Sequence, residues 1–270
     1  MPTYSVTGVN VGTFNLGEAD KVLTIFTAER GLIRAVAKGA RKPGSKIAGR
    51  AELLTVNNLL VATGRSLDII TQAEALETFS RLRHDLVRLS YGLYYAELTQ
   101  CFGQGLAEES GVYFDYLLDA VKRQAEGAID PALLSLRFEL GLLEMLGYKP
   151  ELGFCVVCRQ VLADANLAAF HKDWGGIICK PCLSRARGEA ARGGGEDGID
   201  VSAVRQAREI TPMVWRHLVL AAGDRDPSEA LAGQTLSPAL KQSLLAARRI
   251  VQGYIEHRAG RRMKALDLLS

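Results

Sequence analysis

The order of apolar and polar residues divides the chain into two parts with different periods. Over residues 1–78, apolar and polar side chains alternate, as at Tyr4 and Val6, which predicts short β-strands. The alternation is interrupted at Gly8, where we expect a β-bulge. From Phe79 onward, apolar residues recur every three or four positions, which predicts amphipathic helices. The pattern indicates an α+β protein whose strands come first.

The first part is predicted to form a closed β-barrel. After the first strand, apolar runs at Val22–Thr27 and Leu32–Ala37 flank one glycine-containing turn, and runs at Leu53–Val61 and Leu67–Thr71 flank another. Five short strands without a helical period fit a small barrel of the OB-fold type. The third and fourth strands are joined by a glycine-rich connection, Lys38–Arg50, which we expect to be flexible.

The second part is predicted to be helical, with one insertion. We expect helices over 79–102, 112–125, 130–147 and 201–222, the last interrupted near residue 211, and a long helix from Ser237-Pro238 onward. Five glycines within 187–198 predict a mobile loop. The expected domains are an OB-fold domain at 1–78, helical parts at 79–150 and 188–270, and a zinc-binding segment at 151–187.

Two Cys-x-x-Cys pairs, Cys155 with Cys158 and Cys179 with Cys182, are separated by 20 residues in that segment. Two tight turns that each present two thiolates complete a tetrahedral Zn²⁺ site. Four sulfur ligands leave no position for water, so we expect the zinc to be structural. Disulfides or reduced core thiols are the alternative, which the symmetric spacing disfavours. Since four thiolates fill the site, His171 is expected to be a surface turn residue.

The overall composition is that of a globular protein, and charge becomes informative only through its distribution. Hydrophobic residues make up 48% and charged residues 23%, and a net charge of +3 is too small to indicate nucleic acid. One stretch carries five cations without an acid: Lys38, Arg41, Lys42, Lys46 and Arg50. A basic loop on an OB barrel suits the phosphates of nucleic acid. A solvated surface turn is the alternative.

A second group of cations lies near the C-terminus, around Arg258, Arg261 and Arg262. Their spacing of three and four residues predicts one shared helix face. This face is either a second phosphate-contacting patch or a solvent-exposed helix end whose cations interact favourably with the negative end of the helix dipole. Base stacking would need exposed aromatic residues, and Tyr4, Phe14 and Phe26 are available, but Tyr4 and Phe26 fit the barrel core equally well, so the sequence does not assign the stacking residue. The remaining members of the basic group are Arg248, Arg249 and Lys264.

Catalytic motifs are not found in the sequence. It has neither a Gly-x-x-x-x-Gly-Lys-Ser/Thr phosphate loop nor a Gly-x-Gly-x-x-Gly after a strand, so we do not expect an enzyme. No apolar run reaches about 18 residues, and the start lacks the pattern of a secretory signal, so a membrane protein is not expected. Thiolate zinc ligands and an unpaired Cys101 suit a reducing cytoplasm.

Three blocks of residues together resemble the RecO family of recombination mediators. The first is Leu16–Leu23, and the second is Ala37-Lys38-Gly39-Ala40-Arg41-Lys42 with Ser45. The third runs from Arg137-Phe138-Glu139-Leu140 through Leu146-Gly147-Tyr148-x-Pro150 into Cys155-x-x-Cys158. The C-terminal third is similar only in its helical character. One departure is Arg159, since many members of the family have glycine after the first cysteine pair.

The resemblance implies an N-terminal OB domain, a helical body and a zinc-bearing insertion in a protein of the bacterial cytoplasm, near the nucleoid. It also implies a non-catalytic role in recombinational repair. Such proteins bind single- and double-stranded DNA, anneal complementary strands and work with RecR to help RecA displace single-stranded-DNA-binding protein. The alternative is a zinc-stabilised adaptor that acts mainly through protein contacts and binds DNA only incidentally.

Overall fold

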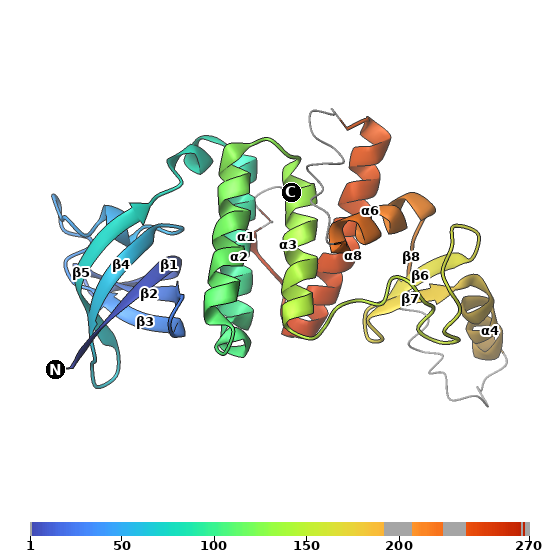
Figure 1. Cartoon of the computed structure of the whole chain (residues 1–270), viewed down its shortest axis with the longest axis horizontal. Coiled ribbons are helices and arrows are strands. Elements are labelled where there is room, and N and C mark those ends of the chain that lie inside the picture. The colour runs from blue at the N-terminus through green and yellow to red at the C-terminus, as the bar shows by residue number, and fades with distance from the viewer. Residues whose placement is uncertain (1, 192–206, 224–235, 266, 268–270) are drawn as a thin grey trace. The chain divides into compact units, whose positions relative to one another are not determined.

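A computed structural model describes residues 2–191, 207–223, 236–265 and 267 (Figure 1). The chain forms two compact units. The first runs to Pro131 and takes in the segment from Met263 onward, and the second spans Ala132–Arg262. Within the described ranges, no helix is both long and apolar enough to cross a membrane.

The first unit begins with a closed five-stranded barrel, ordered β1-β2-β3-β5-β4. Strand β1 pairs with β2 through its C-terminal half and with β4 through its N-terminal half. This is the arrangement of an OB fold, so the predicted α+β class and barrel are confirmed. The strands are β1 (Thr3–Leu16), β2 (Asp20–Thr27), β3 (Gly31–Ala37), β4 (Val56–Ala62) and β5 (Asp68–Glu77).

The bulge in β1 lies between Asn10 and Gly12, so its predicted position at Gly8 is wrong. Gly8 continues the regular pairing and lies opposite Thr27. A Cβ atom at this position would come within 2.5 Å of the Ile25 side chain. The glycine therefore serves close packing of β1 on β2 and does not mark the irregularity.

The barrel closes through a short parallel seam between β3 and β5. Only two residue pairs form it, Ala35 with Asp68 and Val36 with Ile69. Beyond the seam, the end of the barrel is filled from the β3–β4 connection, whose residues Ala40 and Ala51 are buried in the barrel core. Small side chains fit here because the core already holds branched residues such as Ile25 and Leu23.

Helices of the first unit cover part of the barrel. They are η2 (Ser80–His84), α1 (Leu86–Phe102), η3 (Gly103–Leu106) and α2 (Ser110–Glu126). The prediction of one helix from Phe79 is wrong at its start, because Phe79 takes a left-handed conformation with φ of 46°. Asp85 then caps α1 by accepting a hydrogen bond from the Arg88 backbone N–H at 3.1 Å. The cap sets the start of the long helix.

The outer face of β1–β3 is buried under these helices near the β2–β3 turn. The rings of Phe26 on β2 and Tyr113 on α2 meet edge to face, with centroids 5.1 Å apart. The Gln100 side-chain amide donates to the Val11 carbonyl at 2.7 Å, and the Ser110 hydroxyl donates to the Ala28 carbonyl at 2.8 Å. In OB folds, strands β2 and β3 usually carry the ligand face. Here, the part of that face around Phe26 is protein interior.

The second unit combines helices with a small antiparallel sheet ordered β7-β6-β8. A short turn after His171 joins two of its strands, and the predicted helix from Ser237-Pro238 is confirmed, where Ser237 caps the Leu240 N–H at 3.4 Å. The elements are α3 (Pro131–Met145), β6 (Leu167–His171), β7 (Gly176–Cys179), α4 (Lys180–Ala191), β8 (Arg208–Glu209), α6 (Pro212–Ala222) and α8 (Pro238–Ala259).

Two boundaries in this unit differ from the predictions. The glycine-rich stretch does not begin as a loop at residue 187, because α4 continues to Ala191, and residues 192–206 lie outside the described part. The helix expected over 201–222 is also wrong in part, because Arg208–Glu209 forms β8 and pairs with β6. Pairing with a neighbouring strand thus decides the structure of a segment whose own pattern is helical.

Arg248 is not a surface cation, although the sequence groups it with the C-terminal arginines. Its Nε atom lies 3.4 Å from Oε1 of Glu139, and both side chains are buried. The pair joins α8 to α3 inside the second unit. A buried cation with a carboxylate partner serves the fold and leaves the basic surface smaller than the sequence suggests.

Candidate nucleic-acid interface and metal centre

The cationic loop, defined here as Lys38–Arg50, is ordered by hydrogen bonds and is not a loose connection. The Gly39 backbone N–H donates to the Asp20 carboxylate at 2.7 Å, and the Arg41 N–H donates to the Ala19 carbonyl at 2.9 Å. Gly39 has a φ of +68°, which glycine adopts without strain. These bonds anchor the start of the loop to the β1–β2 turn.

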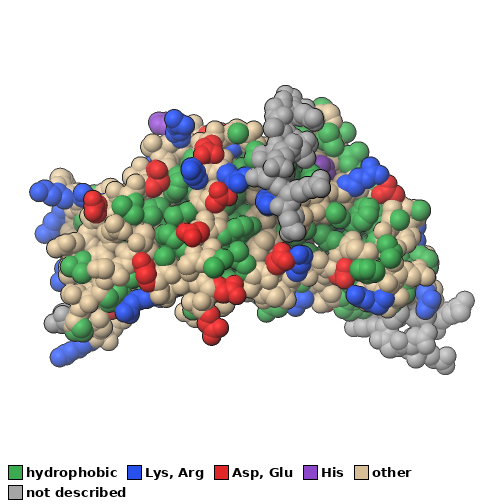
Figure 2. All heavy atoms as spheres, viewed as in Figure 1, with side chains coloured by type: hydrophobic (Ala, Val, Ile, Leu, Met, Phe, Trp, Pro, Cys, Tyr) green, Lys and Arg blue, Asp and Glu red, His purple; other side chains and the backbone are tan. Residues whose placement is uncertain are grey.

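The side chains of the cationic loop divide into an outward and an inward set. Figure 2 shows Lys and Arg side chains gathered at an end of the barrel. Among described residues, these outward cations form no ion pair with a carboxylate, so their charged groups are available to a ligand. Arg41 also donates to the Gly17 carbonyl at 2.8 Å. The exposed cations are Lys38, Arg41, Lys42 and Lys46.

Arg50, the fifth predicted contact residue, lies at the base of the loop and is only partly exposed. Its guanidinium donates to the Lys46 carbonyl. Its own carbonyl accepts hydrogen bonds from the side-chain amides of Asn10 at 2.7 Å and Asn57 at 3.1 Å. Arg50 therefore holds the loop on the barrel, and its cation is less available to a ligand than the other four.

One exposed cation was missed by the sequence analysis. Arg34 lies on β3 opposite Thr24 of β2. Its side chain points outward because successive residues of a strand point to opposite faces and the next residue, Ala35, points into the barrel. The alternation within Leu32–Ala37 was the available signal. Arg34 lies on the same strand as the start of the cationic loop and extends its positive surface along β3.

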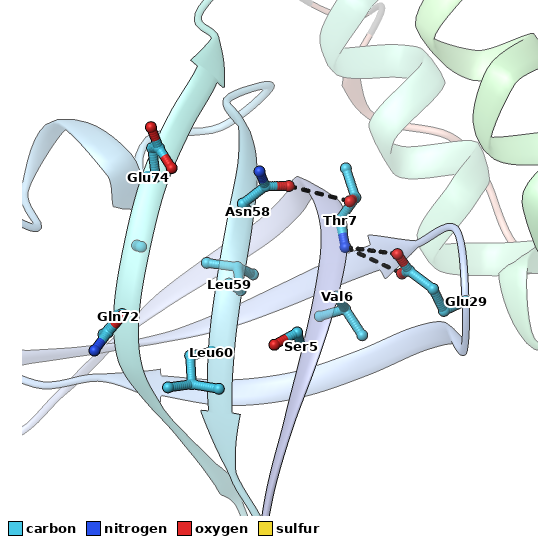
Figure 3. Close-up of a pocket in the computed structure, with 10 residues that line it drawn as sticks. Ser5, Val6, Thr7, Glu29, Asn58, Leu59, Leu60, Gln72 and Glu74 are labelled. Atoms are coloured by element: carbon cyan, nitrogen blue, oxygen red, sulfur yellow. Dashed lines mark hydrogen bonds between the residues drawn. The ribbon is translucent and has the colours of Figure 1, made fainter.

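A separate hollow of about 420 Å³ lies on another face of the barrel, over β1, β4 and β5 (Figure 3). Both oxygens of the Glu29 carboxylate accept the Thr7 backbone N–H at 3.0 Å, and the Thr7 hydroxyl bonds Asn58 at 3.1 Å. Glu74 adds a second carboxylate to the lining. This acidic hollow repels phosphates, so it does not compete with the cationic loop for a polyanion.

The C-terminal arginines do not share a helix face, so that prediction is wrong. Helix α8 ends at Ala259, and Gly260 takes a φ of 64°, which turns the chain before Arg261 and Arg262. Both arginines are exposed beyond the helix end. The Arg258 guanidinium lies 5.0 Å from the ring centroids of both Tyr148 and Tyr254, so it packs within its own unit.

The four predicted zinc ligands form one group, the cysteine cluster: Cys155, Cys158, Cys179 and Cys182. Their sulfur atoms all lie within 4.8 Å of one another. The Cys158 and Cys179 sulfurs are 3.7 Å apart, close to the edge of about 3.8 Å that a tetrahedron with Zn–S bonds of 2.3 Å requires. None of the four is in a disulfide. The donor set and its spacing fit a metal ion.

The electrostatics of the cysteine cluster also suit a cation. Burial raises the pKa of the Cys182 thiol, as do the neighbouring thiols, because several negative sulfurs repel one another. Burial acts on Cys155 in the same direction, but backbone N–H groups, led by that of Cys158, lower its pKa to about 7. A divalent ion would remove the repulsion among thiolates, and the four ligands would leave no open position.

The two Cys-x-x-Cys turns, called knuckles below, come from different local structures. The second pair spans the end of β7 and the first turn of α4, while the first lies in a loop where the Cys155 N–H bonds the Gln160 carbonyl at 2.8 Å. Arg159 takes a φ of 60°, the left-handed conformation that glycine would adopt freely. The knuckle keeps its shape despite the missing glycine, at the cost of backbone strain.

His171 is not the surface turn residue that the sequence predicts. Its side chain is fully buried, and its ring stacks on Trp174 with centroids 4.3 Å apart. The Trp174 N–H also approaches the His171 Nδ1 atom at 3.4 Å. Stacking on Trp174 thus accompanies burial of the imidazole. His171 is not part of the four-residue cysteine cluster.

Comparison with known proteins agrees with this architecture. The family model "Recombination protein O N terminal" matches residues 1–79, and "Recombination protein O C terminal" matches residues 83–191. A DNA repair protein RecO from Synechococcus sp. (strain JA-2-3B'a(2-13)) is 34% identical over 285 residues, which cover 99% of this chain and 89% of the relative. A DNA repair protein RecO from Gloeobacter violaceus is 41% identical over 189 residues, covering 68% of this chain and 70% of the relative. The chain belongs to the RecO family of DNA repair proteins.

Proposed function

We propose that this chain binds single- and double-stranded DNA through the cationic loop and anneals complementary strands without nucleotide hydrolysis. In the cell it would act with RecR to help RecA replace single-stranded-DNA-binding protein on exposed strands. The family supplies these partners, and the loop supplies the DNA contact. Arg34, Arg261 and Arg262 are further contact candidates, while Arg50 is only partly exposed and the exposed Arg258 packs against two tyrosine rings.

The observation that supports this proposal is a row of outward cations on a fixed backbone. Lys38, Arg41, Lys42 and Lys46 are exposed, and the loop that carries them is tied to the barrel by backbone hydrogen bonds. Little conformational freedom is lost when such a loop binds a polyanion. Cations between two strands reduce the repulsion of their phosphates, which lowers the barrier to pairing.

Zinc is proposed as a structural ion held by Cys155, Cys158, Cys179 and Cys182. It would supply no chemistry beyond linking the two knuckles, because four thiolates complete its coordination. The cationic loop and the cysteine cluster are therefore separate sets of residues, and they lie in separate units.

Annealing of two complementary oligonucleotides, one labelled for fluorescence, tests the proposal in the full-length protein without nucleotide. The double variant Lys38→Glu/Arg41→Glu is expected to slow annealing and weaken binding. The slope of log affinity against log salt should fall by about 0.7 for each phosphate that the variant no longer neutralises. A variant with Lys122→Glu and Lys241→Glu changes the net charge equally on helices α2 and α8 and should behave as the wild type.

An unchanged salt slope in the loop variant would remove the cationic loop from the mechanism. The adaptor alternative predicts a different pattern, in which DNA affinity is weak at physiological salt while purified RecR is bound tightly by wild type and loop variant alike. A pull-down with RecR, run beside the DNA titration, separates the two hypotheses.

A further inference from the structure

The outer face of β1–β3 is covered near Phe26 and exposed at Phe14. Directly opposed residues on neighbouring strands point to the same face, so Phe14, Val22 and Val36 form one row across β1, β2 and β3. The row of Phe26 and Leu32 lies nearer the helices, where Phe26 packs against Tyr113. A ligand on this face is thus restricted to the end that carries Phe14.

Of the three aromatic residues considered for stacking, two are already engaged. Phe26 is fully buried. The Tyr4 ring lies under the Arg30 guanidinium, 4.1 Å from its centroid, and its hydroxyl donates to Asp68. Phe14, in contrast, is 52% exposed. Val22, its direct partner on β2, is buried and gives the ring an apolar neighbour.

Phe14 lies next to the cationic loop through the β1–β2 turn. The turn residues Gly17 and Ala19 accept hydrogen bonds from Arg41, and Asp20 accepts one from Gly39. Phe14 is three residues from Gly17, a distance of about 10 Å along an extended chain. Single-strand binding sites combine an aromatic stacking surface with cations along the backbone, and this arrangement places the long cationic side chains near the phosphates of a base that stacks on Phe14.

We infer that Phe14, flanked by the exposed Leu16, stacks on one unpaired base of a strand whose phosphates lie on the cationic loop. This inference rests on the proposed DNA binding and adds a preference to it. Bases in a duplex are already stacked on each other, so only a single strand or a frayed end can offer a face to Phe14. The cations alone would bind both forms.

Fluorescence anisotropy with a labelled oligothymidine, and with a duplex of equal length, tests this inference in the full chain. Phe14→Leu keeps the apolar volume and removes the aromatic face. It should weaken single-strand binding about tenfold and leave both the salt slope and duplex affinity unchanged. Phe14→Trp should retain single-strand affinity, and its added emission should be quenched on binding. Phe154→Leu, at an aromatic that is 43% exposed in the second unit, is the matched control.

The possible outcomes separate this inference from the function on which it rests. Unchanged single-strand affinity in Phe14→Leu, together with weakened binding in Lys38→Glu/Arg41→Glu, overturns the stacking site and leaves the DNA interface intact. Equal losses for single strands and duplex, or loss of affinity in Phe14→Trp, also overturn it. If charge reversal in the loop has no effect on DNA binding, the proposed function fails and the stacking site fails with it.

Discussion

The cationic loop and the first cysteine knuckle are both short, irregular connections, but they direct their functional groups in opposite directions. In the cationic loop, the backbone and small residues such as Ala40 face inward, and the charges face solvent. In the knuckle, the sulfur of Cys155 faces inward and its neighbour Arg159 faces solvent. Substitutions in the first loop should therefore separate binding from stability, whereas ligand substitutions in the second should not.

The largest expected effect is the loss of a metal ligand. Cys158→Ser should abolish binding of one metal ion and unfold the segment around β6 and β7, because metal-binding free energy on the order of 10 kcal/mol is coupled to folding. Metal content by atomic emission and thermal unfolding by circular dichroism measure both effects. Cys101→Ser, at a half-buried thiol of α1 outside the cysteine cluster, should keep the metal. A metal-free Cys158→Ser protein of wild-type stability would contradict a structural ion.

The inward side of the cationic loop gives the next largest effect. Ala40→Leu inserts extra volume into the end of the barrel and should lower the free energy of unfolding by about 1–3 kcal/mol. Lys42→Leu makes the same kind of change on the exposed side and should alter it by less than about 0.5 kcal/mol. Urea unfolding compares the two. Equal destabilisation would show that the loop has no inward and outward sides.

Relief of strain in the knuckle should have a smaller, stabilising effect. Arg159→Gly removes a left-handed arginine and should raise the free energy of unfolding by about 0.5–1 kcal/mol, after the entropy that glycine adds to the unfolded chain. Arg159→Ala keeps the strain and removes the 3.4 Å ion pair with Glu151, so it should not stabilise. Chemical denaturation distinguishes them. If alanine stabilises as much as glycine does, backbone strain is not the cause.

The stability contributed by helix α6, which bonds the chain just before the first knuckle, should depend weakly on pH. Helix α6 carries Trp215, whose indole donates to the Leu152 carbonyl at 2.9 Å, and His217, which bonds the Ser243 hydroxyl at 2.9 Å. Burial holds the pKa of His217 below its ordinary 6.5. The unfolded chain therefore binds the proton more readily, and stability falls as the pH drops below about 6.5. His217→Asn should reduce this dependence in melting curves recorded between pH 5 and 8. An identical pH profile would exclude His217 as its source.

The local signals in the sequence predict the fold well. Alternation located the barrel strands, the Ser-Pro pair located the start of α8, and cysteine spacing located the cysteine cluster. Each of these depends on residues close together in the chain, whose patterns reflect local geometry. The same is true of the loop cations, whose exposure follows from a glycine-rich turn on a barrel.

The features that were not predicted depend on contacts between distant segments. The β2–β3 face is covered because Tyr113 of α2 packs against Phe26. Arg248 points inward because it forms an ion pair with Glu139 on another helix. His171 is buried because Trp174 offers a stacking surface. The end of α8 did have a local signal in the sequence, Gly260. The prediction of a longer helix rested instead on the spacing of the nearby arginines. Periodicity describes faces only while the helix lasts.

The two-pair seam between β3 and β5 has a consequence for motion. Parallel pairing is less stable than antiparallel pairing, so opening of the barrel should begin where Val36 lies beside Ile69. The cationic loop leaves β3 one residue beyond Ala37. An oligonucleotide bound to the loop would stabilise the closed β3–β5 pairing. The backbone amides of this seam should then exchange with deuterium more slowly than in the free protein.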